Sequence, residues 1–135
     1  MKRAPLLLTG LLVVVLGVVV VVRAATAQDP AVVNATTVHV KIDNARVRVL
    51  ESALAPGEKE KLHSHPACVI YVIAGGRIRN HTADGKASEA ELATGDVVYR
   101  EPVTHWAENI GSTTVRIVIV ELKPPGGAAT PAGAR

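Results

Sequence analysis

Aromatic residues and cysteines are scarce in this sequence of 135 residues, which contains no phenylalanine, one tryptophan, two tyrosines and one cysteine. A single cysteine excludes an intramolecular disulfide, so packing has to hold the fold together. The core has to be built from valine, isoleucine, leucine and alanine, and the β-branched members of this set favour strands. Basic clusters with interleaved aromatic residues are also missing, which argues against nucleic acid as a partner.

The longest uncharged stretch lies near the N-terminus. The basic start Met1-Lys2-Arg3 is followed by residues 5–22, which carry no charge and are rich in leucine and valine. Ala25-Thr26-Ala27 offers small residues where a signal peptidase cleaves, so residues 1–27 are predicted to be a signal peptide. The apolar run is also close to the ~20 residues that span a bilayer, so an uncleaved membrane anchor is the alternative. Both interpretations predict an exported protein, either periplasmic or secreted, or anchored in the membrane by its N-terminus.

The net charge of +3 comes from this N-terminal segment. Three of the 15 basic residues lie within residues 1–27, and without them 12 basic residues are balanced by 12 acidic ones. Residues 28–135 are formally neutral and long enough for one domain with a modest core.

Short apolar runs broken by turn signals fill residues 37–123, preceded by a predicted linker at 28–36 and followed by a predicted disordered tail at 124–135. Ala83-Asp84-Gly85-Lys86 is a strong hairpin signal. The alternation of apolar and polar residues predicts strands over 38–42, 47–51, 59–65, 69–73, 77–79, 88–92, 97–99, 105–110 and 114–122. This all-β pattern favours a jelly roll, which leaves a cavity between its two sheets.

Two histidines that are two residues apart, His63 and His65, are the most informative feature of the chain. In an extended strand such residues point to the same face, so both imidazoles could converge on one divalent metal ion. A His-x-His pair in an exposed strand is more often plain polar surface. The metal hypothesis therefore depends on a third histidine further along the chain, His105.

The spacing of these residues resembles the first motif of the cupin superfamily. Gly57 is followed by five residues, His63-Ser64-His65, three residues, Val69, six residues and Gly76. The family has a glutamate at the position of Val69.

The second cupin motif is looser in this chain. Gly95-Asp96, Pro102, His105 and Asn109 follow in the right order, although the Gly-to-His spacing is one residue short and the glycine after the proline is missing. The resemblance covers residues 37–123 and implies a single-domain, cupin-type jelly-roll barrel.

This resemblance also implies a metal site. His63, His65 and His105 would bind a divalent transition metal, with Fe, Zn, Ni, Mn and Cu as candidates. Because Val69 cannot coordinate a metal, the expected site is a neutral three-His site with positions open for water or substrate. Such a site would favour a small anionic or oxygen-rich molecule, with oxygenase-type or isomerase-type chemistry if the protein is an enzyme.

Two other functions stay open. One is a non-catalytic cupin that binds or senses a small molecule, with or without metal. The other is a structural or dimerising β-domain, in which an edge strand such as residues 114–122 pairs two copies into a homodimer.

Three further residues near the motifs receive separate predictions. Tyr71 shares the strand parity of His63 and is the one catalytic candidate, as a proton donor in the cavity. Cys68 is expected to be a buried thiol that points away from the histidines. Arg100 either pairs with an anion or is a solvated surface charge.

Overall fold

A computed structural model describes residues 28–125. The predicted signal peptide or anchor at residues 1–27, and the predicted tail beyond Pro125, lie outside the described residues. Within residues 28–125, no helix is both long and apolar enough to cross a membrane.

One short helix and nine strands make up the described chain, and each strand overlaps one of the predicted runs. The alternation in the sequence therefore identified the strands, although β3 begins at His63 and not at residue 59. The elements are α1 (Pro30–Val33), β1 (Val38–Asp43), β2 (Val47–Leu54), β3 (His63–His65), β4 (Cys68–Ala74), β5 (Gly76–Thr82), β6 (Ala87–Leu92), β7 (Val97–Arg100), β8 (Val103–Asn109) and β9 (Val115–Leu122).

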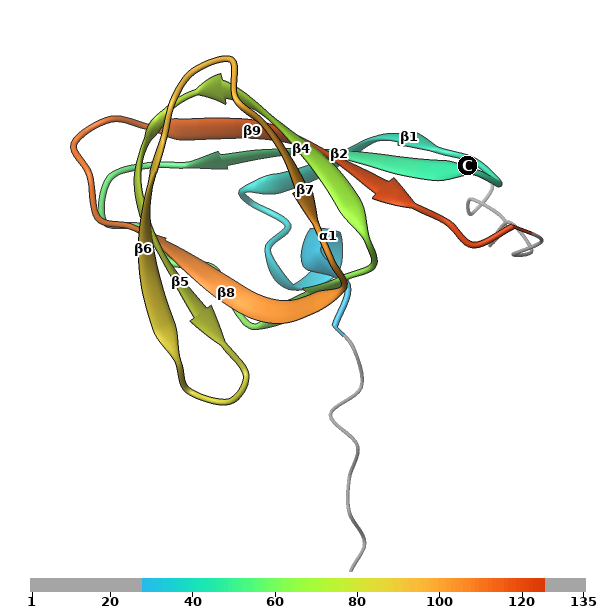
Figure 1. The fold of residues 1–135 in the computed structure, drawn as a ribbon, viewed down its shortest axis with the longest axis horizontal. Helices are drawn as coiled ribbons and strands as arrows, with labels where there is room; N and C mark the ends of the chain where they lie inside the picture. Colours follow the sequence, from blue (N-terminus) through green and yellow to red (C-terminus); the bar gives the residue numbers. More distant parts are fainter. Residues whose placement is uncertain (1–27, 126–135) are drawn as a thin grey trace, which may run out of the picture.

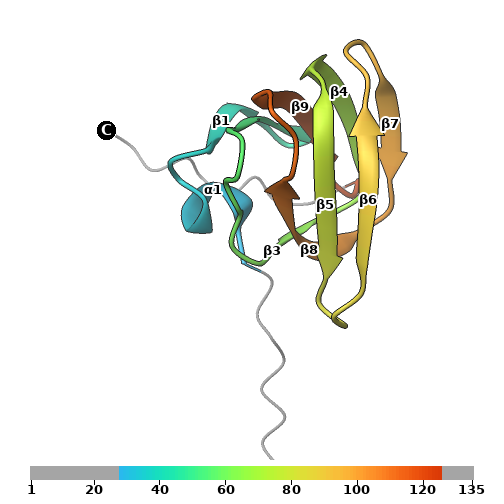
Figure 2. The ribbon, with the colours of Figure 1, turned by 90° about the vertical axis from the view of Figure 1, so that its left-hand side faces the viewer.

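The strands form two antiparallel sheets that enclose the interior of the domain (Figure 1 and Figure 2). The five-stranded sheet has the order β1-β2-β9-β4-β7, and the four-stranded sheet has the order β3-β8-β5-β6. This arrangement confirms the all-β jelly-roll barrel. It also makes β3 and β8, which carry the three histidines, direct neighbours.

The strand at residues 114–122 was expected as an edge for pairing two copies, and this expectation is wrong. β9 lies between β2 and β4 and is hydrogen-bonded on both sides, so its backbone has no free edge. The reason is its long apolar run, which is typical of a central strand buried on both faces. Homodimer formation stays a prediction, and the edge strands of the two sheets are β1, β7, β3 and β6.

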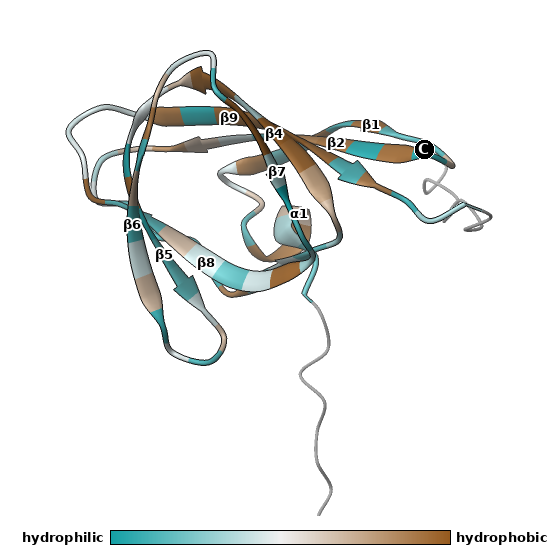
Figure 3. Cartoon of the chain, viewed as in Figure 1, coloured by the Kyte–Doolittle hydropathy of each residue, from teal (hydrophilic) through white to brown (hydrophobic). Residues whose placement is uncertain are grey.

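The centre of the core lies on the five-stranded sheet. Val38, Leu50, Cys68 and Ile119 form a buried cluster in which no member is more than 5% exposed. Figure 3 shows the corresponding hydrophobic colour along β4. Each fully buried aliphatic side chain contributes about 1.5–3 kcal/mol, which is how a core without phenylalanine stabilises the domain.

Residues 28–36 are not the linker that the sequence suggested. Pro30 occupies the first turn of α1, and the Asp29 side chain accepts a hydrogen bond from the Ala31 amide at 2.9 Å, which caps the helix. The helix contacts β1 and β3. Pro30 and Asn34 are buried, so this segment belongs to the folded domain.

Two glycines have conformations or contacts that other residues cannot match. Gly85 has a φ of +85° in the turn between β5 and β6, which confirms the hairpin predicted there. A Cβ atom on Gly75 would lie 2.1 Å from the Leu92 carbonyl oxygen, so the tight connection between β4 and β5 requires glycine.

Candidate metal centre

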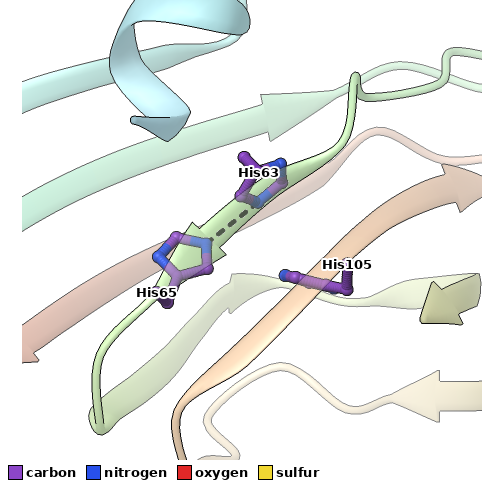
Figure 4. A group of neighbouring side chains, drawn as sticks. All are labelled: His63, His65 and His105. Carbon is purple, nitrogen blue, oxygen red and sulfur yellow. Dashed lines mark hydrogen bonds between the residues drawn. The ribbon is translucent and has the colours of Figure 1, made fainter. Parts of the chain in front are cut away.

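The three histidines meet inside the barrel. His63 on β3 lies directly opposite His105 on β8 in the antiparallel register, and His65 follows two residues after His63 on the same face. All three are buried, with exposed fractions of 2%, 7% and 8% for His63, His65 and His105. Figure 4 shows the rings of β3 and β8 facing one another across a short gap.

The distances between ring nitrogens fit coordination of one ion. The Nε2 atoms of His63 and His65 are 3.0 Å apart, and one nitrogen from each of the three histidines lies within 4.8 Å of the others. Two nitrogens that each lie about 2.1 Å from a metal are at most about 4.2 Å apart. A small rotation of the rings is therefore enough to bring all three onto one ion.

The protonation of the two β3 histidines follows from their outer nitrogens. His63 Nδ1 lies 2.8 Å from the Lys61 carbonyl oxygen, which can only accept a hydrogen bond. His65 Nδ1 lies 2.7 Å from Glu121 Oε1, which accepts when the carboxyl is ionised. These acceptors favour a proton on Nδ1 of both neutral rings, which turns the two Nε2 lone pairs toward each other. On His63 the Asn34 amide nitrogen, a donor 3.1 Å from the same Nδ1, favours the opposite tautomer, in which Nε2 donates to His65.

With both protons on Nδ1, the two Nε2 atoms at 3.0 Å are both acceptors and cannot hydrogen-bond to each other. In that tautomer a cation between the nitrogens, either a proton or a metal ion, satisfies both lone pairs. Burial lowers the pKa of His63 despite its bond to Lys61, which disfavours the proton. The donor set of these residues thus fits a divalent metal that prefers imidazole.

His105 supports the same interpretation. Burial, reinforced by the positive charge of neighbouring His63, His65 and Arg100, lowers the pKa of His105 to about 3, so the ring is neutral at ordinary pH. Its Nδ1 atom is buried without a hydrogen-bond partner among the described residues. A neutral, poorly satisfied imidazole at this position is available as a ligand.

The segment around α1 holds β3 in place. The Asn34 side chain accepts a hydrogen bond from the Lys61 amide at 2.7 Å, and its amide nitrogen lies 3.1 Å from His63 Nδ1. The Ser64 amide donates to the Gln28 carbonyl oxygen at 2.9 Å. Residues 28–36 therefore position the strand that carries two of the three histidines.

A second support lies behind His65. Glu121, 4% exposed on β9, binds His65 Nδ1 and lies 3.7 Å from the Arg48 guanidinium, which in turn binds Asp29 at 2.9 Å. The carboxylate orients the His65 ring, which is the usual role of such a partner in metal sites.

The histidines open into a small cavity between the two sheets, with a volume of about 80 Å³. A cavity of this size accommodates only a small molecule, since drug-sized ligands occupy several hundred Å³. Its walls are mostly apolar, with a few polar and charged groups. The lining residues are Glu60, His63, His65, Cys68, Ile70, Val72, Asn80, Leu92, Val98, Arg100, His105, Ala107, Ile117 and Ile119.

The strand parity expected for β4 is wrong. Cys68, Ile70 and Val72 line the cavity, whereas Tyr71 is 48% exposed and neither it nor Val69 lines it. The chain changes parity at the bend between β3 and β4, so even-numbered residues of β4 share the interior with odd-numbered residues of β3. Tyr71 therefore does not reach the site as the predicted proton donor.

Cys68 and Arg100 also differ from expectation. Cys68 is buried as predicted, but its thiol faces the cavity of the histidines instead of pointing away, and burial raises its pKa. Arg100 lines the cavity and is not a solvated surface charge. None of the ion pairs within residues 28–125 includes Arg100.

Three polar residues of the site were missed by sequence reasoning: Asn34, Glu60 and Glu121. Glu121 stands in a predicted strand, and its position among apolar residues was a signal of a buried carboxylate. Glu60 precedes His63 by three residues, and in a strand this spacing would place the two side chains on opposite faces, so nothing in the sequence indicated that Glu60 lies at the site. Asn34 was hidden by its assignment to a linker.

Comparison with known proteins agrees with this fold. The Cupin domain family matches residues 50–121. A cupin domain from Bordetella pertussis Tohama I is 30% identical, with a TM-score of 0.59, over 64% of this chain and 92% of that one.

Two other solved structures resemble the fold. A conserved protein with a double-stranded β-helix domain from Klebsiella pneumoniae is 24% identical, with a TM-score of 0.50, over 65% of this chain and 76% of that one. An RmlC-like cupin family protein from Methanocaldococcus jannaschii is 19% identical, with a TM-score of 0.51, over 64% of this chain and 81% of that one. No curated protein matches the chain. The family match over the body of the domain, together with the jelly roll and its histidines, shows that this chain belongs to the cupin family.

Proposed function

We propose that this cupin binds one divalent transition metal, such as Fe, Zn, Ni, Mn or Cu, through His63, His65 and His105, and holds a small anionic molecule beside it. The observation that carries the proposal is the convergence of three buried imidazoles whose ring nitrogens lie within 4.8 Å of one another, with the Nε2 atoms of His63 and His65 3.0 Å apart. A bound metal would act as a Lewis acid that polarises a carbonyl or activates water or O₂.

Arg100 supports an anionic ligand. Its guanidinium is a permanent charge with five donors that match a carboxylate, and it faces the cavity without an ion-pair partner among the described residues. The size of the cavity limits the ligand to a small molecule. Ile70, Val72 and Val98 form an apolar part of the cavity wall.

If the protein is an enzyme, oxygenase-type or isomerase-type chemistry fits this arrangement. The second candidate is a non-catalytic binding or sensing cupin, and the mostly apolar lining favours it, because within the described cavity no carboxylate other than Glu60 is placed to accept a proton. Oxygen uptake or substrate turnover by the metal-loaded protein with small carboxylates separates the two. Saturable binding without turnover supports the second candidate.

We also propose export. The support is the uncharged stretch at residues 5–22 followed by Ala25-Thr26-Ala27. N-terminal sequencing of the protein from an exported fraction tests this: a start at Gln28 indicates a cleaved signal peptide, and a start at Met1 in the membrane fraction indicates an anchor. Recovery in the cytoplasm alone contradicts both.

The metal is tested by elemental analysis of the protein purified from its own compartment. We expect about one metal ion per chain, with loss in His63→Ala and His105→Ala. His39→Ala is the matched control, because His39 is exposed on β1 and lies outside the cavity. Absence of metal from the wild-type protein, or equal metal content in all variants, contradicts the proposal.

A further inference from the structure

A buried carboxylate faces the proposed three-His site from an unexpected direction. Glu60 lies in the irregular stretch between Gly57 and β3, and its side chain is only 9% exposed. It lines the same cavity as His63, His65 and His105. On β4, where the family resemblance placed a glutamate, the cavity is lined by Cys68, Ile70 and Val72, none of which is a carboxylate.

The position of Glu60 is compatible with binding the same ion as His63. Its Oε2 atom lies 3.9 Å from His63 Nε2, within the ~4.2 Å that separates two ligand atoms on opposite sides of one metal. The Ala107 amide donates a hydrogen bond to Oε2 at 3.0 Å, so the strand that carries His105 holds the carboxylate in place.

Within residues 28–125 the Glu60 carboxylate has no close lysine or arginine, because Arg100, which lines the same cavity, acts on it only from beyond ion-pair distance. Among the described residues its one ion-pair contact is His63, and no lysine or arginine lies within 4.0 Å. A buried carboxylate needs a cation or full hydrogen bonding to remain charged, and a single amide supplies only part of this. A divalent ion between Glu60 and the histidines would provide the missing charge.

We propose that Glu60 is the fourth protein ligand of the metal, so that the site is three-His-one-Glu with its carboxylate supplied from before the His-x-His pair. The inference rests on the proposed metal-binding function. It changes the charge of the loaded site from +2 to +1, and an oxygen donor beside three imidazoles extends the set of suitable metals toward Mn and Fe.

The test compares Glu60→Gln with the wild-type full-length protein by titration with Co²⁺ near neutral pH. Glutamine keeps the size of the side chain and an oxygen that accepts the Ala107 hydrogen bond, so only the charged ligand is removed. Glu91→Gln is the control, because the Glu91 side chain is 70% exposed and lies outside the cavity. Circular dichroism establishes that both variants are folded.

We expect the Co²⁺ affinity of Glu60→Gln to fall by more than about 100-fold, beyond the 10–100-fold that loss of an outer partner costs. The visible absorption bands of bound Co²⁺ should also change in position or intensity. Unchanged bands in Glu60→Gln overturn the inference, whatever the affinity, because they show that the carboxylate is not in the coordination sphere.

Failure of this inference is distinguishable from failure of the proposed function. Suppose that the wild-type protein binds Co²⁺, that His63→Ala does not, and that Glu60→Gln has the wild-type spectrum and affinity. This result supports the three-His function and rules out Glu60 as a ligand. Wild-type protein that binds no Co²⁺ contradicts the metal function, and the role of Glu60 falls with it.

Discussion

The low pKa of His105 predicts that the metal-free protein loses stability as the pH falls from about 7.5 to about 5. In the folded protein burial lowers this pKa to about 3, whereas the ordinary value is 6.5. Between about pH 3 and pH 6.5, the pKa values of His105 in the folded and unfolded chain, the unfolded chain binds a proton at His105 that the folded chain does not. The free energy of unfolding therefore decreases as the pH falls below about 6.5.

The magnitude follows from the size of the pH step. One pH unit below the unfolded pKa corresponds to about 1.4 kcal/mol, so at pH 5 His105 alone should cost about 2 kcal/mol relative to pH 7.5. His63, whose pKa is also lowered by burial, adds to the same trend. Glu60 opposes it, because a raised carboxyl pKa makes the folded state bind protons more readily at low pH.

Urea unfolding in the presence of a chelator, at both pH values, measures this effect. The comparison is between the wild-type protein and His105→Gln, because groups that do not contact His105 titrate alike in both and cancel in the difference. We expect the wild-type protein to lose about 2 kcal/mol more than the variant between pH 7.5 and pH 5. An equal loss in the two proteins would refute the assignment of a neutral, proton-excluding His105.

Three further predictions concern residues around the site. Glu121→Gln should weaken metal binding by about tenfold in a chelator competition, because the His65 ring loses its charged partner; unchanged affinity would contradict the orienting role. Asn109→Ala should lower the free energy of unfolding, measured in urea, by on the order of 3 kcal/mol. Asn109 is 1% exposed, donates hydrogen bonds to the Leu54 and Thr113 carbonyl oxygens and accepts one from the Gly111 amide. A loss below about 1 kcal/mol would argue against this network. Cys68 should react with a thiol reagent at neutral pH at least about tenfold more slowly in folded than in urea-unfolded protein, because its thiol is buried and its pKa raised; equal rates would contradict this.

The strands and the three histidines could be predicted from the sequence because both depend on local patterns. In β2 (Val47–Leu54) buried and half-buried residues alternate from Leu50 onward, as expected for a strand with one face on the core. His63 and His65 are two residues apart within one strand, so their common face follows from strand geometry alone. His105 was placed by the order of the motifs, and its register opposite His63 then followed from the jelly roll.

The residues that line the cavity around the histidines could not be predicted in the same way, because their positions depend on breaks in the strand periodicity. Residues 60–62 are irregular, so even-numbered Glu60 faces the same cavity as odd-numbered His63. The bend before β4 shifts the parity again, which places Ile70 inside and Tyr71 outside. Counting residues across a bend preserves motif spacing but not the face of the sheet. The proposal for Glu60 depends on such a break, because a carboxylate from a segment that the motif treats as a spacer lies 3.9 Å from His63, whereas the motif position on β4 has none.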